Sequence, residues 1–260
     1  MAFNLSSAAL VMGPSGWPNP TDIYLDVVER LYLSPLGFEG TTHSLYTPSA
    51  LGPTDPNLAD DVRYILKAVY EQIAAGTVSA ESPLWLFGYS QSAAAASMAA
   101  IELEAAGVPS EYLHFVLVGN SASAHGGFLN MFLDSMPALW KQFLVANSDL
   151  LAFTNSAGLT TPEFFPTDVF TITNDGFANW PASILDFDAL LSALYGMAVS
   201  HNLYLGLSPH NIPDVAVPDH VQGLANYYSI ALEGINVWEA LVTSAVAVGL
   251  IPEWLGDLIA

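Results

Sequence analysis

The sequence contains no cysteine and very few positive charges. Without cysteine, disulfides, a thiol nucleophile and thiolate metal ligands are excluded, and the redox compartment stays undetermined. The formal net charge is −21, and the fixed cations are Arg30, Arg63, Lys67 and Lys141. A chain so poor in cations is unsuited to binding nucleic acid, and it is equally unsuited to electrostatic docking on an anionic membrane.

Apolar runs long enough to span a bilayer are also missing. The run at residues 240–251 is too short and is followed by Pro252 and Glu253. Residues 1–12 lack the basic start of a secretory signal peptide and lead directly into a glycine- and proline-rich turn. We therefore expect no transmembrane span, and an export signal, if there is one, to lie outside this sequence.

What the chain does have is apolar bulk. Apolar residues make up 52% of the 260 residues, charged residues only 11%, and the mean hydropathy is +0.42. This length allows one large domain with a sizeable core. Such a composition suggests that apolar surface is covered by a lid, a partner or lipid.

The most informative stretch is a short apolar run, residues 84–87, followed by Gly88-Tyr89-Ser90-Gln91-Ser92 and an alanine-rich segment. A buried strand, a sharp turn carrying a serine and a helix form a nucleophile elbow. Gly88 and Ser92 are small enough for strand and helix to approach closely, although glycine is more usual at the second position. The helix amides would then stabilise an oxyanion at Ser90. The alternative is a plain turn in which Ser90 caps the helix.

Strands and helices alternate along much of the chain. Expected strands cover residues 8–12, 43–46, 115–118 and 168–173, and expected helices cover residues 22–31, 58–73 (capped by Asn57) and 186–199. This alternation predicts parallel βαβ units with helices on both faces of the sheet. Ligands of such sheets bind beyond the carboxyl ends of the strands. The turns after Met12, at Ser90 and at Gly119 would meet at that edge, and Ser15 or Gly16 would offer a second oxyanion amide, unless that turn is an ordinary one.

A complete set of catalytic groups follows in the chain order typical of α/β-hydrolases: Ser90, Asp175 and His201. His201 would take the proton from Ser90, while Asp175 would orient the imidazole. Spacing alone leaves rivals open. These are Asp168, Asp186 and Asp188 for the acid, and His210 and His220 for the base. His125 lies in a flexible loop and has no evident partner.

Two segments depart from the alternation. Residues 121–166 hold a loop and an apolar stretch at 128–147, which we interpret either as a lid or cleft wall or as a buried helix. Residues 221–260 are expected to be helical and either to cover the fold or to form a homodimer surface. We expect residues 1–260 to form a single domain.

The chain resembles the PE-PPE domain of mycobacteria and related actinobacteria. The resemblance covers about residues 8–207 and is carried by short motifs in a fixed order: 10–16, Gly88-Tyr89-Ser90-Gln91-Ser92, 115–120, 174–181 and 201–205. It implies a cutinase-like serine α/β-hydrolase. Members resemble esterases of short- to medium-chain acyl esters, and some resemble acyltransferases on trehalose glycolipids of the cell envelope.

Carried over to this sequence, the resemblance implies Ser90 as nucleophile, Asp175 as orienting acid, His201 as base and the Gln91 amide as an oxyanion donor. It also implies a secreted or cell-envelope location, with peripheral association with envelope lipids. Two features differ from the family. Many members carry an N-terminal helical PE or PPE domain, whereas this sequence begins directly at the hydrolase strand, and cutinases rely on disulfides that this chain cannot form.

We therefore expect an α/β-hydrolase that acts by acyl transfer through an acyl-enzyme, with an acyl ester or lipid as substrate. We expect neither a cofactor nor a metal, since the histidines show no ligand-like spacing. Hydrolysis and transfer to a sugar hydroxyl both remain open. The alternative from another functional class is a non-catalytic lipid-binding or scaffold protein on the same fold.

Overall fold

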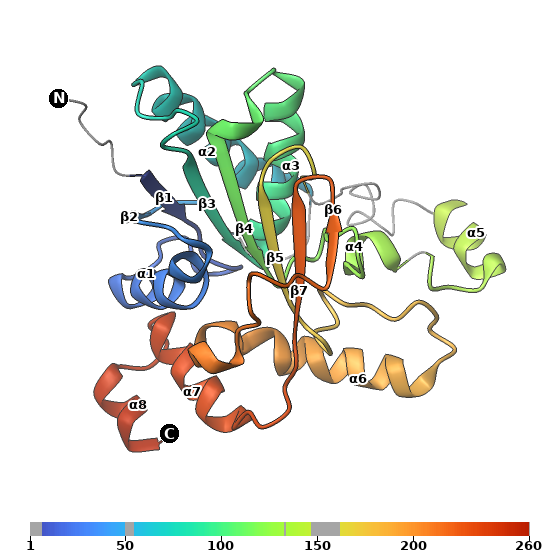
Figure 1. The fold of residues 1–260 in the computed structure, drawn as a ribbon. Helices are drawn as coiled ribbons and strands as arrows, with labels where there is room; N and C mark the ends of the chain where they lie inside the picture. The colour runs from blue at the N-terminus through green and yellow to red at the C-terminus, as the bar shows by residue number, and fades with distance from the viewer. Residues whose placement is uncertain (1–6, 50–54, 133, 147–161, 260) are drawn as a thin grey trace.

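The computed structural model describes residues 7–49, 55–132, 134–146 and 162–259. A seven-stranded sheet in the order β2-β1-β3-β4-β5-β7-β6 runs through them (Figure 1). All neighbouring strands pair in parallel except β6 and β7. The strands are β1 (Ser7–Val11), β2 (Gly40–Ser44), β3 (Leu84–Tyr89), β4 (Leu113–Val118), β5 (Thr167–Ile172), β6 (His220–Gln222) and β7 (Ala225–Ile230).

The helices cover both faces of the sheet. They are α1 (Asp22–Val28), α2 (Asp55–Ala74), α3 (Gln91–Ala105), α4 (Phe128–Met131), α5 (Ala138–Ala146), α6 (Phe187–Ala198), α7 (Val237–Ala247) and α8 (Glu253–Ile259). Side chains alternate along β3, so that Leu84 and Leu86 pack with α2 and α3, whereas Trp85 and Phe87 pack with α1 and α7. This is the expected mostly parallel α/β-hydrolase architecture.

The first helices differ in detail from expectation. A π-helical turn (Glu29–Leu33) extends α1, whose first turn is capped by the Thr21 side chain. The helix α2 begins at Asp55, so that Asn57 lies inside the helix rather than capping it. Pro56 falls in its first turn, where the amide that proline lacks would have no partner within the helix.

The C-terminal segment corrects one prediction. Residues 221–260 were expected to be helical, but β6 and β7 occupy 220–222 and 225–230, and helix begins only at Val237. The strand β7 pairs in parallel with β5 along its whole length, and Ala225, Tyr227, Tyr228 and Ile230 are buried there. Gly223, with φ of 59°, supplies the turn between β6 and β7.

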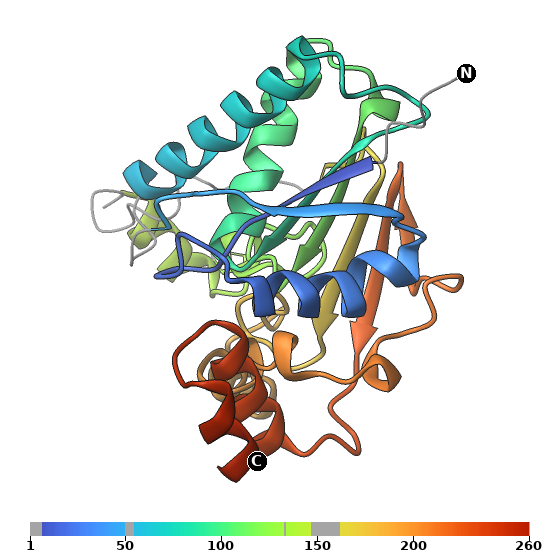
Figure 2. The same cartoon turned by 90° about the vertical axis from the view of Figure 1, so that its left-hand side faces the viewer.

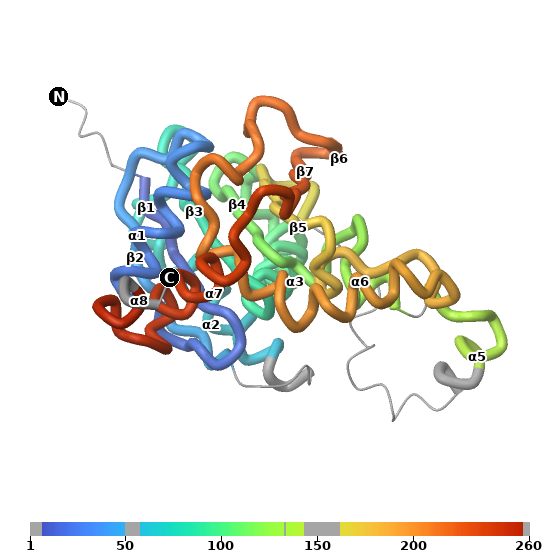
Figure 3. The backbone as a smooth tube through the Cα atoms, turned by 90° about the horizontal axis from the view of Figure 1, so that it is seen from below, coloured from blue at the N-terminus to red at the C-terminus, as the bar shows by residue number. Residues whose placement is uncertain are grey.

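The carboxyl ends of the parallel strands point toward α6 and α7, which lie beyond that edge in two views (Figures 1 and 2). Figure 3 shows α5 at the periphery, away from α7 and α8. Leu139 and Trp140 of α5 are 76% and 60% exposed. The alternative of one buried helix over residues 128–147 is therefore wrong, since two short helices stand there and the second is open on one side. Residues 147–161 of the expected lid lie outside the described residues.

Within the described parts of the chain, no helix combines the length and the apolar character that crossing a bilayer requires.

Candidate active site

Ser90 stands at a sharp turn between β3 and α3. Its φ of 58° is the strained backbone of a nucleophile elbow, and its side chain makes no capping hydrogen bond, which excludes the alternative of a helix cap. A Cβ on Gly88 would lie 2.8 Å from the Ala93 backbone, so glycine is needed there. The serine at the second small position fits because the Ser92 hydroxyl accepts from the Tyr89 amide at 2.9 Å and donates to the Tyr89 carbonyl at 3.0 Å.

Three side chains from separate elements form one hydrogen-bonded chain. His201 Nε2 lies 2.7 Å from Ser90 Oγ, and His201 Nδ1 lies 2.8 Å from Asp175 Oδ2. Asp175 is fully buried and His201 is 8% exposed. The second carboxylate oxygen of Asp175 accepts from the Phe177 amide at 3.0 Å. The imidazole is thus fixed between an acid and a hydroxyl, the arrangement in which it can move a proton.

Several contacts position the imidazole. His201 lies in a 3-10 turn (Ser200–Asn202) directly after α6, and its carbonyl accepts a hydrogen bond from the buried Tyr89 hydroxyl. Phe177 packs against its ring, with centroids 4.7 Å apart. Gly119, at φ of 58°, lies beneath it, and a Cβ there would be 3.1 Å from His201 Cε1.

A buried tyrosine completes the acid's environment. The Tyr204 hydroxyl donates to Asp175 Oδ2 at 2.8 Å and accepts from the Ile172 amide at 2.9 Å. Burial, and secondly the nearby Asp175 carboxylate, raises the pKa of Tyr204 well above its ordinary value, which keeps it a neutral donor.

The structure places the alternative candidates for the acid and the base at other positions. Asp168 lies near the amino end of β5, at the edge of the sheet opposite to Ser90, and its Oδ2 is 2.6 Å from His114 Nε2. Asp186 caps α6 through the Ala189 amide, and Asp188 is exposed in the first turn of that helix. His210 is exposed, and the ring of His220 packs against His125 at 4.3 Å.

The side chain of Gln91, the residue after Ser90, joins two other parts of the chain. The Ser15 hydroxyl donates to Gln91 Oε1 at 2.5 Å, and Gln91 Nε2 donates to Asp61 Oδ2 at 2.8 Å. The other Asp61 oxygen accepts from the Ser49 amide at 2.8 Å. The first turn after β1 is therefore tied to the elbow, which places Ser15 beside Ser90.

Gly16 does not fit its predicted role. Its amide donates to the Ser49 carbonyl at 2.7 Å and is not available to an oxyanion. Within the described residues, the amides of Ser15 and Gln91 have no intramolecular partner, and they are the remaining pair of donors. The chain turns at Gly16, with φ of 83°, and its amide faces the carbonyl of Ser49.

Sequence reasoning missed two buried residues of this site, Tyr204 and Asp61. A signal for Asp61 was present, because it falls among the apolar positions Leu58, Val62 and Ile65 of α2, where an acid needs a partner. For Tyr204 the sequence offered no comparable signal, since a tyrosine three residues after His201 fits ordinary core packing.

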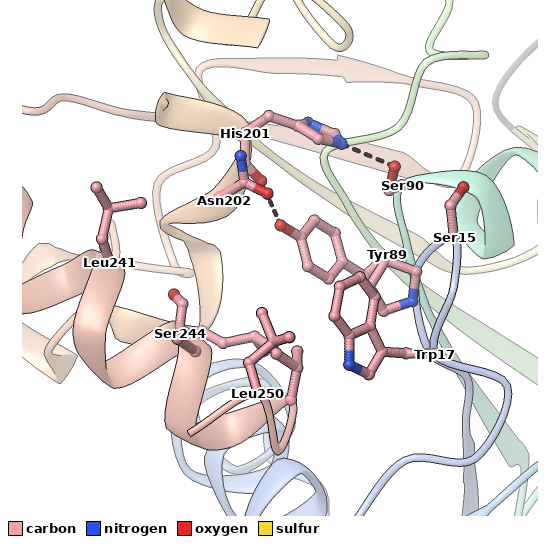
Figure 4. Close-up of a pocket in the computed structure, with 13 residues that line it drawn as sticks. Ser15, Trp17, Tyr89, Ser90, His201, Asn202, Leu241, Ser244 and Leu250 are labelled. Atoms are coloured by element: carbon pink, nitrogen blue, oxygen red, sulfur yellow. Dashed lines mark hydrogen bonds between the residues drawn. The ribbon is translucent and has the colours of Figure 1, made fainter. Parts of the chain in front are cut away.

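Two cavities open at Ser90. One, of about 330 Å³, lies between the first turn and α7 and is shown in Figure 4, with Trp17 and Tyr89 facing Leu241 and Ser244. The other, of about 290 Å³, is lined mainly by apolar side chains of α3, α4 and the loop at Phe177. Ser15, Ser90 and His201 line both cavities.

The sequence model of the PE-PPE domain family matches residues 41–259. The chain belongs to the PE-PPE domain family. It is 31% identical over 268 residues to the esterase PE16 of Mycobacterium tuberculosis, covering 96% of this chain and 46% of that protein. It is also 31% identical over 249 residues to the uncharacterized PPE family protein PPE28 of the same species, covering 90% of this chain and 35% of that protein. This PE-PPE domain therefore spans less than half of each relative's length.

Solved structures similar to this PE-PPE domain are distant. A cutinase-like protein from Cryptococcus sp. has 17% identity and a TM-score of 0.46, over 75% of this chain and 94% of its own. The Vlm2 thioesterase domain has 14% identity and a TM-score of 0.38, over 97% of this chain and 91% of its own. The fold assignment rests on the sheet order and the elbow rather than on these similarities.

Proposed function

We propose that this PE-PPE domain is a serine carboxylic-ester hydrolase or acyltransferase. Ser90 Oγ attacks the ester carbonyl while His201 Nε2 takes its proton, and the carbonyl–alcohol bond breaks as His201 protonates the departing alcohol oxygen. The acyl group then passes from Ser90 to water or to a second alcohol. Asp175 accepts a hydrogen bond from His201 Nδ1, which keeps the imidazole in the tautomer whose unprotonated Nε2 faces Ser90.

The observation that carries this proposal is the continuous chain from Asp175 through His201 to Ser90, with hydrogen bonds of 2.8 and 2.7 Å. These groups meet at a strained elbow that has two free amides beside it, those of Gln91 and Ser15. Preorganised amides of this kind stabilise the negative charge that develops on the carbonyl oxygen. A binding protein has no need of either the strained turn or the buried acid.

The substrate class follows from the surroundings of Ser90. Both cavities are mainly apolar, and four cations against 25 acids make an anionic substrate unfavourable. Neutral esters of short- to medium-chain acids, or neutral lipids of the cell envelope, suit these surroundings. Similarity to the relative named as an esterase agrees with this choice.

We further propose where the protein acts and how it assembles. Family membership supports work outside the cytoplasm or at the cell envelope, with peripheral contact to its lipids. Trp238 and Trp254, on α7 and α8, are 60% and 66% exposed. We predict that these exposed rings form part of a homodimer surface, and measurement of the oligomeric state in solution tests this.

A fluorophosphonate probe tests the enzymatic proposal. Labelling of the folded protein is expected to disappear in Ser90→Ala and to persist in Ser110→Ala, whose hydroxyl donates to the exposed Glu111 carboxylate. Absence of labelling in folded wild-type protein would instead support the alternative of a non-catalytic lipid-binding or scaffold protein. Product analysis with and without added alcohol then separates hydrolysis from acyl transfer.

A further inference from the structure

The two cavities at Ser90 differ in chemistry. The cavity beside α4, here named the α4 arm, adds mainly apolar side chains to the shared residues: Leu58, Ala94, Phe128, Leu129 and Phe177. The cavity beside α7, here named the α7 arm, also adds apolar side chains, among them Leu205, Leu241 and Leu250, but it differs in holding the indole of Trp17 and the polar side chains of Asn202 and Ser244. The carbonyl carbon of an ester carries an acyl chain and an alcohol group that diverge from it, so the two halves of a substrate bound at Ser90 can enter different cavities.

Ser244 lines the α7 arm with a buried hydroxyl. Its side chain is buried, at 7% exposure, and its hydroxyl has no hydrogen-bond partner within the described residues. Leaving a buried hydroxyl unpaired costs about 1–3 kcal/mol. A helical serine normally avoids this cost by donating to a carbonyl four residues earlier, as Ser97 does to Ala93 at 3.0 Å.

The unpaired hydroxyl therefore points to a ligand. Figure 4 shows Ser244 projecting from α7 on the side of the pocket opposite Ser15 and Ser90. A ligand hydroxyl in the α7 arm would satisfy it, whereas an alkyl chain there would leave it unpaired. The flat ring of Trp17 offers an apolar surface to the C–H face of such a ligand.

We propose that the α7 arm binds the alcohol half of the substrate, that this alcohol carries at least one further hydroxyl, and that Ser244 binds it. The α4 arm then holds the acyl chain. This inference rests on the proposed ester chemistry. Because His201 borders both arms, it can protonate the alcohol oxygen as the acyl–oxygen bond breaks, and it can take the proton of an incoming alcohol in the reverse step.

A crossed experiment tests the assignment. Butyrate esters of ethanol and glycerol vary the alcohol, and p-nitrophenyl butyrate and octanoate vary the acyl chain. Ala245→Leu, which fills the α7 arm from a partly exposed position, should lower kcat/KM for the glycerol ester relative to the ethyl ester. It should leave the octanoate-to-butyrate ratio unchanged. Ser121→Leu, which fills the α4 arm, should change only the octanoate-to-butyrate ratio.

Ser244 has its own test. Removing a neutral hydrogen bond of about 0.5–1.5 kcal/mol should make Ser244→Ala roughly 2- to 12-fold poorer toward the glycerol ester, with the ethyl ester unaffected. Ser244→Thr, which keeps the hydroxyl, should restore the preference and controls for folding. Equal effects on both esters, or filling variants with the reversed pattern, would overturn the assignment. A wild-type protein that is neither labelled nor able to cleave any ester overturns the proposed function itself, and this inference with it.

Discussion

The Tyr204 hydroxyl donates to the same oxygen of Asp175 that faces the imidazole of His201, at 2.8 Å in both cases. Two donors thus converge on one buried carboxylate oxygen, while the Phe177 amide holds the other. Both carboxylate oxygens of Asp175 are therefore held by hydrogen bonds from described residues. Its orientation, and through it that of His201, depends on a tyrosine that touches neither Ser90 nor the cavities.

Tyr204→Phe tests this positioning role. Loss of one hydrogen bond to the carboxylate, worth about 1.5–3 kcal/mol, should destabilise the fold and lower kcat about 10-fold or more, with KM little changed. Steady-state kinetics and urea unfolding measure the two effects. A variant that loses stability but keeps full kcat would show that Tyr204 is structural only.

Asp175→Asn is expected to reduce kcat about 10⁴-fold, because an amide would favour the wrong imidazole tautomer. The matched control is Asp168→Asn. That carboxylate accepts from Asn226 and Tyr228 and lies against His114, so the control should lose about 1–3 kcal/mol of stability but keep its activity. Comparison of p-nitrophenyl ester turnover decides between the two acids. Equal losses would contradict the assignment of Asp175.

Gly119→Ala should impair both folding and turnover. Its φ is 58°, and the added Cβ would press on Tyr204 and His201 at 3.0 and 3.1 Å. Gly107→Ala is the matched control, since φ is 79° there but the Cβ meets nothing within 4 Å. The control should lose only about 1–2 kcal/mol of stability through the left-handed backbone. If both variants keep wild-type kcat, contact of this glycine with His201 does not matter to catalysis.

Asp61 gives a pH-dependent prediction. Burial raises its pKa, and the hydrogen bonds from Ser49 and Gln91 offset part of that effect. On acidification, Asp61 therefore takes up its proton at a higher pH in the folded state than in the unfolded state. The buried charge lowers the free energy of unfolding by its full amount above the folded pKa, and this loss disappears as the pH falls. The wild type should gain stability relative to Asp61→Asn as pH is lowered from 7 to 4. Urea unfolding across this range measures the free energy of unfolding of both proteins, and a wild type that loses stability relative to Asp61→Asn on acidification contradicts the prediction.

Local patterns in the sequence sufficed for the central parallel strands. Apolar runs bounded by turns located β1, β3, β4 and β5, and small residues around Ser90 located the elbow, since both features depend on neighbours within a few residues. The strand β7 escaped prediction because its sequence interrupts the apolar residues with Asn226 and Ser229 and so forms no continuous apolar run. Its burial follows from its pairing with β5 and not from a local run.

The sequence by itself determined the order of Ser90, Asp175 and His201 along the chain and the place of each after a strand or helix. Spacing left Asp175 and Asp168 open and the family resemblance favoured Asp175, whereas the tertiary structure gives the physical reason: Asp168 lies near the amino end of β5 and Asp175 beyond its carboxyl end, at opposite edges of the sheet. It also decided that the Gly16 amide is engaged by Ser49 and that Tyr204 and Asp61 support the site. Tyr204 lies 29 positions from Asp175 and Asp61 lies 30 positions from Gln91, and chain order alone does not fix which residues at such separations meet.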